Sequence, residues 1–335
     1  MERSGLIAGG NFIVDLTRVI DNFPAEETLS NIIATEASNG GAAYNVLKDL
    51  ALMGASFPLT GIGMIGDDEA GMGILSDLDK LGINHDRILK TGKAGTSFTD
   101  VMVSAGSGKR TFFHYRGANA LLSPEHFSFK DTRAKIFHYG YPLLLDSLDI
   151  IDRDGRTGGS RILEEARKNG LRVTVDLVSV NNNRFAEIVS PVFPYTDYLF
   201  MNEIETEKLT GINILDHDQP DRDKLKEVAG TILEQGVGTV IIHFPAGAAS
   251  VSGNSAYFTG RVNIPKAIVA GTTGAGDAFA AGFLYGLHEG LSVQECLKMA
   301  SCSAATCLLH PTCSGGIQPI KECLALGEKY GFGNL

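Results

Sequence analysis

The sequence predicts an α/β protein with a doubly wound, mostly parallel sheet and a small antiparallel β sheet that serves as a lid. Strand and helix signals alternate through the last two thirds of the chain, which is typical of a parallel sheet with helices on both faces. The 335 residues are 44% hydrophobic and 20% charged, enough to bury a sizeable core. We expect one domain over residues 1–335.

The alternation consists of short apolar runs separated by amphipathic segments. The predicted helices end in glycine, a common helix C-terminal residue, at Gly170 and Gly236. The strands are expected at residues 134–142, 171–177, 196–202 and 237–244, and the helices at 159–170 and 223–236.

Two segments interrupt this alternation and are the expected lid. Residues 11–40 contain strand-like runs without a crossover helix, and residues 95–118 predict a hairpin with its turn near Ser104–Gly108. Inserted in the α/β body, they predict a small sheet over a site at the carboxyl edge of the parallel strands.

Charge and cysteine content narrow the class of partner and the compartment. A formal net charge of −10 disfavours nucleic acid and anionic membrane as main partners. No apolar run approaches the roughly 18 residues needed for a transmembrane helix. The N-terminus shows no signal peptide pattern, so we expect a cytoplasmic protein. Its five cysteines contain no CxxC pair and predict buried thiols rather than a zinc site.

Two glycine-rich stretches imitate nucleotide motifs. Residues 61–66 fit GxGxxG, but Asp67, Asp68 and Glu69 follow at once and would repel a pyrophosphate. Residues 105–111 imitate a Walker A loop, but Arg110 stands where Ser or Thr should follow the lysine. This second stretch predicts a solvated hairpin turn.

The stretch GTTGAGD at residues 271–277 carries the chemistry. Backbone N–H groups of Gly274, Ala275 and Gly276 can form an anion hole at the start of a helix. An isolated Asp277 would be a helix cap. Beside an anion hole, however, it can accept the proton of a hydroxyl that is being phosphorylated.

Five motifs in order resemble the ribokinase, or PfkB, family of carbohydrate and nucleoside kinases over nearly the whole chain. GTTGAGDAFAAGF is similar to the family's C-terminal signature, and GIGMIGDDEAG at 61–71 to its N-terminal one. The other three are NGGAAYN (39–45), RGANALLSP (116–124) and NEIETEKLTG (202–211). The resemblance implies a ribokinase-like fold.

The resemblance also implies roles for individual residues. Asp277 matches the catalytic base, and Gly274, Ala275 and Gly276 match the anion hole. The NxxE pair, Asn202 and Glu205, implies Mg²⁺ held largely through water near ATP. The remaining expected contacts are Asp15, Gly40, Gly41, Asn45 and Arg116 to substrate, and Thr272, His243 and Gly247 to nucleotide.

Several positions depart from ribokinase. Gly271 stands where many relatives have Asp, which leaves the use of a monovalent cation such as K⁺ open. Ile13, Ala42 and the Gly140–Tyr141 pair replace polar ribokinase residues, so free ribose is a poor candidate. Pro245 in HFPAGAAS departs from the T-x-G-x-x-G turn that usually follows this strand in relatives.

The sequence therefore predicts an ATP-dependent phosphotransferase that acts on a hydroxyl of a small sugar or sugar derivative. A nucleoside kinase is the alternative, and a sugar-phosphate kinase that uses Arg116 or Lys109 is a further one. A non-catalytic sugar- or nucleoside-binding regulator on the same fold belongs to another class. The resemblance implies a homodimer that forms through the lid.

Overall fold

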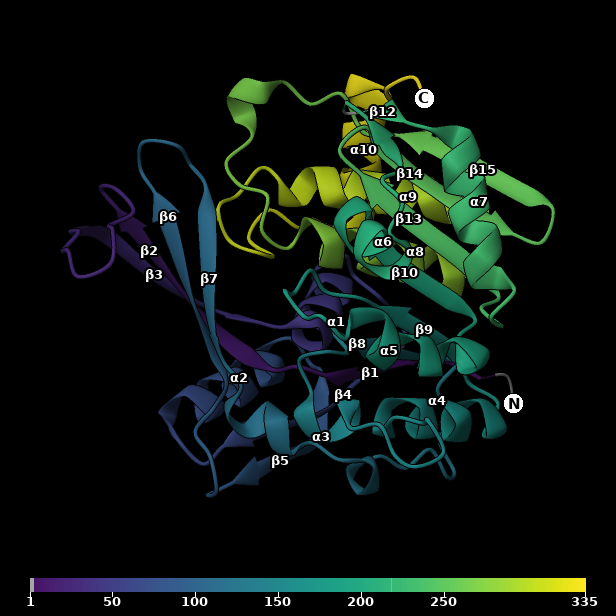
Figure 1. Ribbon diagram of the computed structural model, residues 1–335, viewed down its shortest axis with the longest axis horizontal. Helices are drawn as coiled ribbons and strands as arrows, with labels where there is room; N and C mark the ends of the chain where they lie inside the picture. The colour runs from purple at the N-terminus through teal and green to yellow at the C-terminus, as the bar shows by residue number, and fades with distance from the viewer. Residues whose placement is uncertain (1–2, 218) are drawn as a thin grey trace.

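A large twisted sheet organises the molecule, and the computed structural model describes residues 3–217 and 219–335. In the described residues the strand order is β15-β14-β13-β10-β9-β8-β1-β4-β5 (Figure 1). Pairs from β13 to β5 are parallel, and β13, β14 and β15 form an antiparallel edge. The strands are β1 (Leu6–Gly10), β4 (Leu59–Gly66), β5 (Asn84–Thr91), β8 (Ile136–Gly140), β9 (Arg172–Asp176), β10 (Tyr198–Asn202), β13 (Thr239–Phe244), β14 (Gly247–Ser252) and β15 (Ser255–Gly260).

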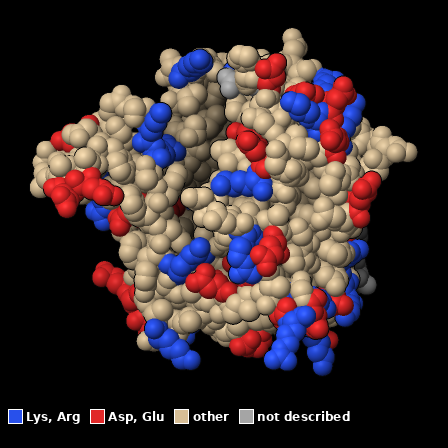
Figure 2. Space-filling model, in the orientation of Figure 1, with Lys and Arg blue, Asp and Glu red and all other residues tan. Residues whose placement is uncertain are grey.

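A smaller sheet of order β3-β2-β6-β7 projects to one side of this body (Figure 1). Its strands are β2 (Ile13–Ile20), β3 (Ile32–Gly40), β6 (Phe98–Ser104) and β7 (Arg110–Tyr115). The outer pairs are antiparallel as predicted, but the inner pair, β2 and β6, is parallel. Figure 2 shows a hollow between this sheet and the rest of the molecule.

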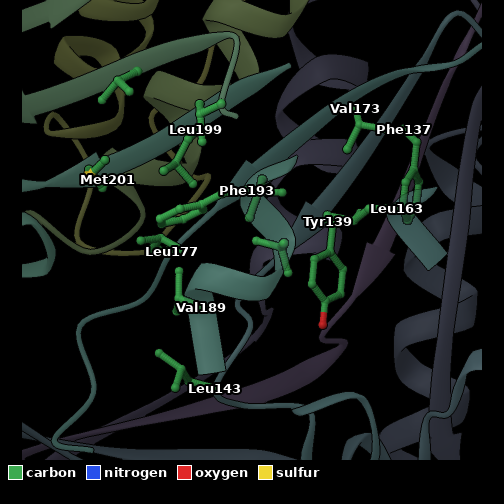
Figure 3. Packing of buried hydrophobic residues seen from close by; sticks show 14 of the residues in the cluster. Phe137, Tyr139, Leu143, Leu163, Val173, Leu177, Val189, Phe193, Leu199 and Met201 are labelled. Carbon is green, nitrogen blue, oxygen red and sulfur yellow. The ribbon is translucent and has the colours of Figure 1, made fainter. Parts of the chain in front are cut away.

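Helices cover both faces of the large sheet, because alternate strand residues face opposite sides. Ile7, Val240 and Ile242 belong to one apolar cluster, while Leu6 and Ile241 belong to another. Figure 3 shows the first cluster, where Phe137, Tyr139 and Val173 lie near Leu163. Helices α4, α5 and α7 contribute to this cluster, and α1, α2, α8 and α9 to the second. The helices are α1 (Ala42–Leu52), α2 (Glu69–Lys80), α3 (Asp146–Asp149), α4 (Gly158–Lys168), α5 (Phe185–Val189), α6 (Glu203–Thr210), α7 (Arg222–Leu233), α8 (Ala275–His288), α9 (Val293–Cys307) and α10 (Ile320–Tyr330).

The elements predicted from the sequence are present, with ends that differ by at most three residues. The predicted strands are β8, β9, β10 and β13, and the predicted helices are α4 and α7. The hairpin turn is closed by a hydrogen bond from the Gly108 N–H to the Ser104 carbonyl, 2.8 Å long. All five cysteines are free and buried, as predicted. No helix among the described residues has the length and apolarity to cross a bilayer.

Candidate active site

A cavity of about 740 Å³ opens at the carboxyl ends of β8, β9, β10 and β13. This is the sheet edge where open α/β folds bind ligands. Its wall includes Asp176 and Asn202, the last residues of β9 and β10, and His243 near the end of β13, together with the first turn of α8. The carboxyl edge therefore gathers residues from distant parts of the chain around one space.

Asp277 lies buried in the first turn of α8, with a hydrogen bond to each carboxylate oxygen. The Asn45 amide donates to Oδ2 over 2.8 Å, and the Tyr141 hydroxyl donates to Oδ1 over 2.7 Å. Burial raises the pKa of Asp277 to about 6, and the two hydrogen bonds oppose the rise. The result is a carboxylate that is oriented, nearly dehydrated and able to exchange a proton near neutral pH.

The start of α8 is a tight glycine turn whose first N–H groups have no side-chain cap. Gly274 adopts φ 80°, and a Cβ at this position would approach the Cys313 carbonyl oxygen to 2.5 Å. Only glycine fits this turn without strain. Gly274 offers no side-chain cap, so the N–H groups of the first helical turn are not capped by a side chain. Ala275 and Gly276 line the large cavity, which places this turn at its wall.

Asp15 and the Gly40–Gly41 pair meet where the small sheet joins the body. A Cβ at Gly40 would lie 2.1 Å from Asp15 Oδ2, so glycine is required for the carboxylate to sit there. Gly41 has φ 97°, and its Cβ would lie 2.5 Å from the Asn11 carbonyl oxygen. Burial raises the pKa of Asp15 to about 6, with a further contribution from Asp277. The two acids are therefore electrostatic neighbours.

Asn202 and Glu205 form a capping box at the start of α6. The Glu205 N–H donates to Asn202 Oδ1 over 2.8 Å, and the Asn202 N–H donates to Glu205 Oε2 over 2.8 Å. The Ser179 hydroxyl also donates to Glu205 Oε1 over 2.8 Å. Burial raises the pKa of Glu205 to about 7. Since the pair caps a helix and also lines the cavity, its structural role accompanies any role in binding.

The oxygen donors near this pair fit a hydrated Mg²⁺. Asp176, Ser179, Asn202 and Glu205 all line the cavity, and Mg²⁺ prefers oxygen ligands and retains several waters. No group of three or more His, Cys, Asp or Glu residues in the described ranges is arranged to hold a metal directly. The arrangement therefore suits contact through water rather than an all-protein cage.

The expected nucleotide residues lie around the same cavity. Thr272, His243 and Gly247 all line it. The His243 ring packs 5.3 Å from that of Phe279, between centroids, and burial lowers its pKa to about 4. Gly247 turns the chain from β13 into β14, and a Cβ there would collide with the Thr259 carbonyl oxygen. A neutral imidazole thus stands at the wall of the cavity.

Arg116 does not join the other predicted site residues. Its guanidinium donates to the Leu143 carbonyl oxygen over 2.6 Å and pairs with Asp146 at 3.2 Å. The cavity walls near Asp277 do not include it. Arg116 instead joins the end of the lid hairpin to the loop after β8.

Sequence reasoning missed the roles of Tyr141 and Asp176. From the sequence, Tyr141 was treated only as part of a pair that replaces polar ribokinase residues, yet its hydroxyl contacts Asp277. Its φ of 58°, rare for a non-glycine residue, follows the end of β8. Asp176 is buried at the end of β9, and burial raises its pKa well above the ordinary range. An acid that ends a buried strand was the available signal.

Comparison with known proteins identifies the family. The family model described as pfkB family carbohydrate kinase matches residues 5–320. The chain belongs to this family.

Individual relatives agree with that membership. This pfkB kinase is 29% identical over 303 residues to "Probable fructokinase-6, chloroplastic" of Arabidopsis thaliana, covering 86% of this chain and 74% of that protein. Arabidopsis thaliana ribokinase, solved with ribose and ATP, superposes with a TM-score of 0.78 at 23% identity and covers 97% of this chain and 99% of its own. A Methanocaldococcus jannaschii nucleoside kinase superposes with a TM-score of 0.76 at 18% sequence identity. The match covers 98% of this chain and 100% of that one.

Membership settles the fold and the class of reaction. The large, mostly parallel sheet with a separate small sheet is the ribokinase fold. As a pfkB carbohydrate kinase, the protein is a phosphotransferase with an alcohol group as acceptor. The geometry of the site decides which residues perform the transfer and which acceptor is bound.

Proposed function

We propose that this pfkB kinase transfers the γ-phosphate of ATP to a hydroxyl of a small sugar or sugar derivative, with Asp277 as the base. The observation that carries the proposal is a buried, doubly hydrogen-bonded carboxylate one residue after the Gly274–Gly276 turn. A structural cap needs neither burial nor side-chain partners on both oxygens.

The transfer proceeds by in-line displacement. The acceptor oxygen bonds to the γ-phosphorus while the bond from that phosphorus to the bridging oxygen breaks, and ADP leaves with the electron pair. Asp277 takes the acceptor proton as the new bond forms. The N–H groups of Gly274, Ala275 and Gly276 stabilise the charge on the transferring group. Mg²⁺ near Asn202 and Glu205 would supply charge neutralisation on the donor phosphates.

The acceptor lies between the lid and the body. Asp15, at the root of the small sheet, accepts hydrogen bonds from acceptor hydroxyls, and Asn45 contacts a hydroxyl while it orients Asp277. Gly40 and Gly41 allow the lid strand to approach this point. The lid segments, at about 11–40 and 95–118, close over the acceptor and exclude water, so that ATP is not hydrolysed.

A nucleoside is the second candidate acceptor. The fold is shared with a protein whose structure is titled a nucleoside kinase. Tyr141 at the cavity wall and Phe98 at the start of β6 provide aromatic surface. A non-catalytic regulator is disfavoured, since a pure binding protein does not need the Asp277 arrangement.

The remaining proposals concern assembly and conditions. The protein works as a cytoplasmic homodimer joined through the small sheet and as a single kinase domain over residues 1–335. Lid residues Ile33 and Phe112 are 61% and 58% exposed, which supports an apolar contact there. Gly271 supplies no carboxylate to bind a monovalent cation. The assay therefore measures turnover with and without K⁺.

The test is ADP release with MgATP over a panel of sugars, sugar acids, sugar phosphates and nucleosides, with and without K⁺. Asp277→Asn is run beside the wild type. We expect acceptor-dependent turnover that falls by about 10²–10⁴-fold in the variant. Equal turnover by the variant would show that another group is the base. Ligand binding without turnover by the wild type would favour the regulator.

A further inference from the structure

A buried carboxyl group in α1, which the proposed reaction does not use, lies near the proposed base. Asp49 is 0% exposed, and among the described residues neither of its carboxylate oxygens has a hydrogen-bond partner. Val46, Leu47 and Leu50, close to it in the helix, are buried apolar residues. Buried acids are normally paired, because a carboxylate that loses its hydration without compensation is costly. Packing alone therefore does not account for Asp49.

Two further buried oxygen atoms close to Asp49 also lack partners. Asn45 lies one helical turn before Asp49, so the two residues share a face of α1, and Asn45 Oδ1 is unpaired. Ser314 faces Asp49 from the loop that follows α9, and its Oγ is unpaired as well. These three side chains present four acceptor oxygens, and an ionised Asp49 brings no hydrogen to satisfy them.

The surroundings of Asp49 disfavour a negative charge there. Burial raises the pKa of Asp49 well above its ordinary range, Asp277 adds to the rise, and Ser314 and Lys48 oppose it. Lys48 itself pairs with Asp77 at 3.4 Å. The other titratable neighbours are a phenol and three thiols, each with its own pKa raised by burial: Tyr44, Cys307, Cys313 and Cys323. The carboxyl group is therefore set among neutral groups and close to a second acid.

The loop that carries Ser314 packs against the proposed anion hole. A Cβ at Gly274 would lie 2.6 Å from Cys313 Cα, so the backbone next to Ser314 touches this turn directly. The Cys307 thiol donates to the Cys313 carbonyl over 3.0 Å and to the Thr273 carbonyl over 3.4 Å. A group that fixes Ser314 therefore also fixes the support of the turn that is proposed to receive the phosphoryl group.

We propose that Asp49 is a positioning residue that acts with a proton on its carboxyl group, which donates to Ser314 Oγ and holds the 310–316 loop against the Gly274 turn. This inference rests on the proposed kinase function. Asp49 keeps its proton throughout the reaction, while the acceptor proton goes to Asp277. An ionised Asp49 would lose the bond to Ser314 and place a second negative charge near Asp277, where the donor phosphates must approach.

A buried monovalent cation is the competing ligand for these oxygens, because carboxylate, amide and hydroxyl oxygens all suit a hard cation. The structure favours the proton. Asp49, Asn45 and Ser314 are 0%, 3% and 5% exposed, and they line neither of the cavities beside the Gly274 turn. A proton needs no space of its own, whereas an ion does.

The first experiment measures the protonation state of Asp49 without any turnover. Infrared difference spectra are recorded at pH 8 between the wild type and Asp49→Asn. Asp277, with a pKa of about 6, is ionised under these conditions. We expect a protonated-carboxyl C=O band in the wild type that is absent from the variant. Loss of a carboxylate band instead would overturn the proposal.

The second experiment measures the positioning role by turnover. The amide of Asp49→Asn can donate to Ser314 as the acid does, so kcat should stay within about twofold of the wild type. Asp49→Ala and Ser314→Ala each remove the bond. In both, kcat should fall about 10–100-fold while KM changes less than about threefold, because the anion hole acts on the transition state. The double variant should be no slower than either single variant, since all three lack the same interaction.

Leu52→Ala is the matched control. Leu52 belongs to α1 and packs against the second apolar cluster, so this change loosens the same helix without removing a polar group. Turnover of Leu52→Ala should equal that of the wild type. Circular dichroism shows which variants are folded, and Asp49→Asn with Ser314→Ala still tests the proposal if Asp49→Ala does not fold.

The outcomes separate this proposal from the kinase function. A fall of kcat in Asp49→Asn to the level of Asp49→Ala would overturn it and show that the charge is required. Turnover that depends on K⁺ in the wild type but not in Asp49→Asn would also overturn it and assign Asp49 to a cation site. Unchanged kcat in Ser314→Ala would remove the link to the loop. A wild type without turnover on any acceptor would reject the kinase function, and the infrared spectra would still decide whether Asp49 holds a proton.

Discussion

The Tyr141 hydroxyl donates a 2.7 Å hydrogen bond to Oδ1 of Asp277. The tyrosine follows the end of β8 and the acid belongs to the first turn of α8, so the bond joins segments 136 residues apart. Tyr141 holds φ 58°, a conformation that costs a non-glycine residue about 1 kcal/mol or more. Strain at this position is typical of a residue whose side chain must point in one direction. Tyr141 therefore orients the proposed base and favours its ionised form.

Tyr141→Phe should move the acid limb of kcat/KM to higher pH. The limb in the wild type is expected near pH 6, the pKa of Asp277, with activity lost below it as the carboxylate is protonated. Loss of a hydrogen bond that stabilises the carboxylate raises this pKa by about half to one unit. Tyr139→Phe is the control, because Tyr139 is buried in β8, two residues before Tyr141, and its hydroxyl has no hydrogen-bond partner. An unmoved limb in Tyr141→Phe contradicts the assignment.

Asp277→Asn should stabilise the protein at neutral pH. The folded pKa of about 6 lies above the ordinary 3.8, so the folded state binds the extra proton. Wild-type stability is therefore lost as pH rises from about 4 through 6. The variant lacks this ionisation, and Asn45 Oδ1, which has no partner, can turn to accept from the new amide. We expect a gain of about 1–3 kcal/mol in unfolding free energy at pH 8 that vanishes near pH 4, measured by urea titration.

Gly40→Ala should weaken the acceptor site. The new Cβ would lie 2.1 Å from Asp15 Oδ2 and displace the carboxylate. Loss of a charge-assisted hydrogen bond to an acceptor hydroxyl lowers kcat/KM by about 10–100-fold. Gly73→Ala in α2 is the control, since its Cβ meets nothing within 4 Å and alanine favours a helix. Equal kinetics in Gly40→Ala, with the fold intact by circular dichroism, would remove Asp15 from the acceptor site.

The exposed face of the small sheet should hold two copies together. Light scattering is expected to give about twice the chain mass of 35.7 kDa for the wild type. Ile33→Glu places a charge on the apolar surface and should shift the mass towards the monomer, because burying an unpaired carboxylate is unfavourable. A monomer at every wild-type concentration would reject the lid dimer.

Local sequence patterns predicted most of the large sheet. The β9 and β10 strands are short apolar runs between turn residues, and the 159–170 segment has an amphipathic pattern. The local pattern of residues therefore predicts each of these elements. The pairing of β2 with β6 is different. It joins residues about 80 positions apart in parallel, and no local pattern encodes a partner at that separation.

The candidate site divides in the same way. Asp277 and the Gly274–Gly276 turn form one contiguous motif and could be found from sequence. The hydrogen bond from Tyr141 and the surroundings of Asp49 depend on tertiary packing of distant segments. In the sequence, Asp49 is one acid within an apolar helix. Its surroundings are created by Asp277 and Ser314, which sequence spacing cannot bring near it.

The parallel pairing of β2 with β6 also sets an order of assembly. A hairpin can close within microseconds, but a parallel pair must first bring together strands separated by a long loop. Here the intervening chain contains α1, β4, α2 and β5, which belong to the body. During synthesis, β2 and β3 emerge with no partner for the inner edge of β2 until β6 has followed. The nascent lid therefore has an unpaired sheet edge while some 80 further residues are translated. The partner strand β6 reaches this edge only after the β4-α2-β5 unit of the body has been made.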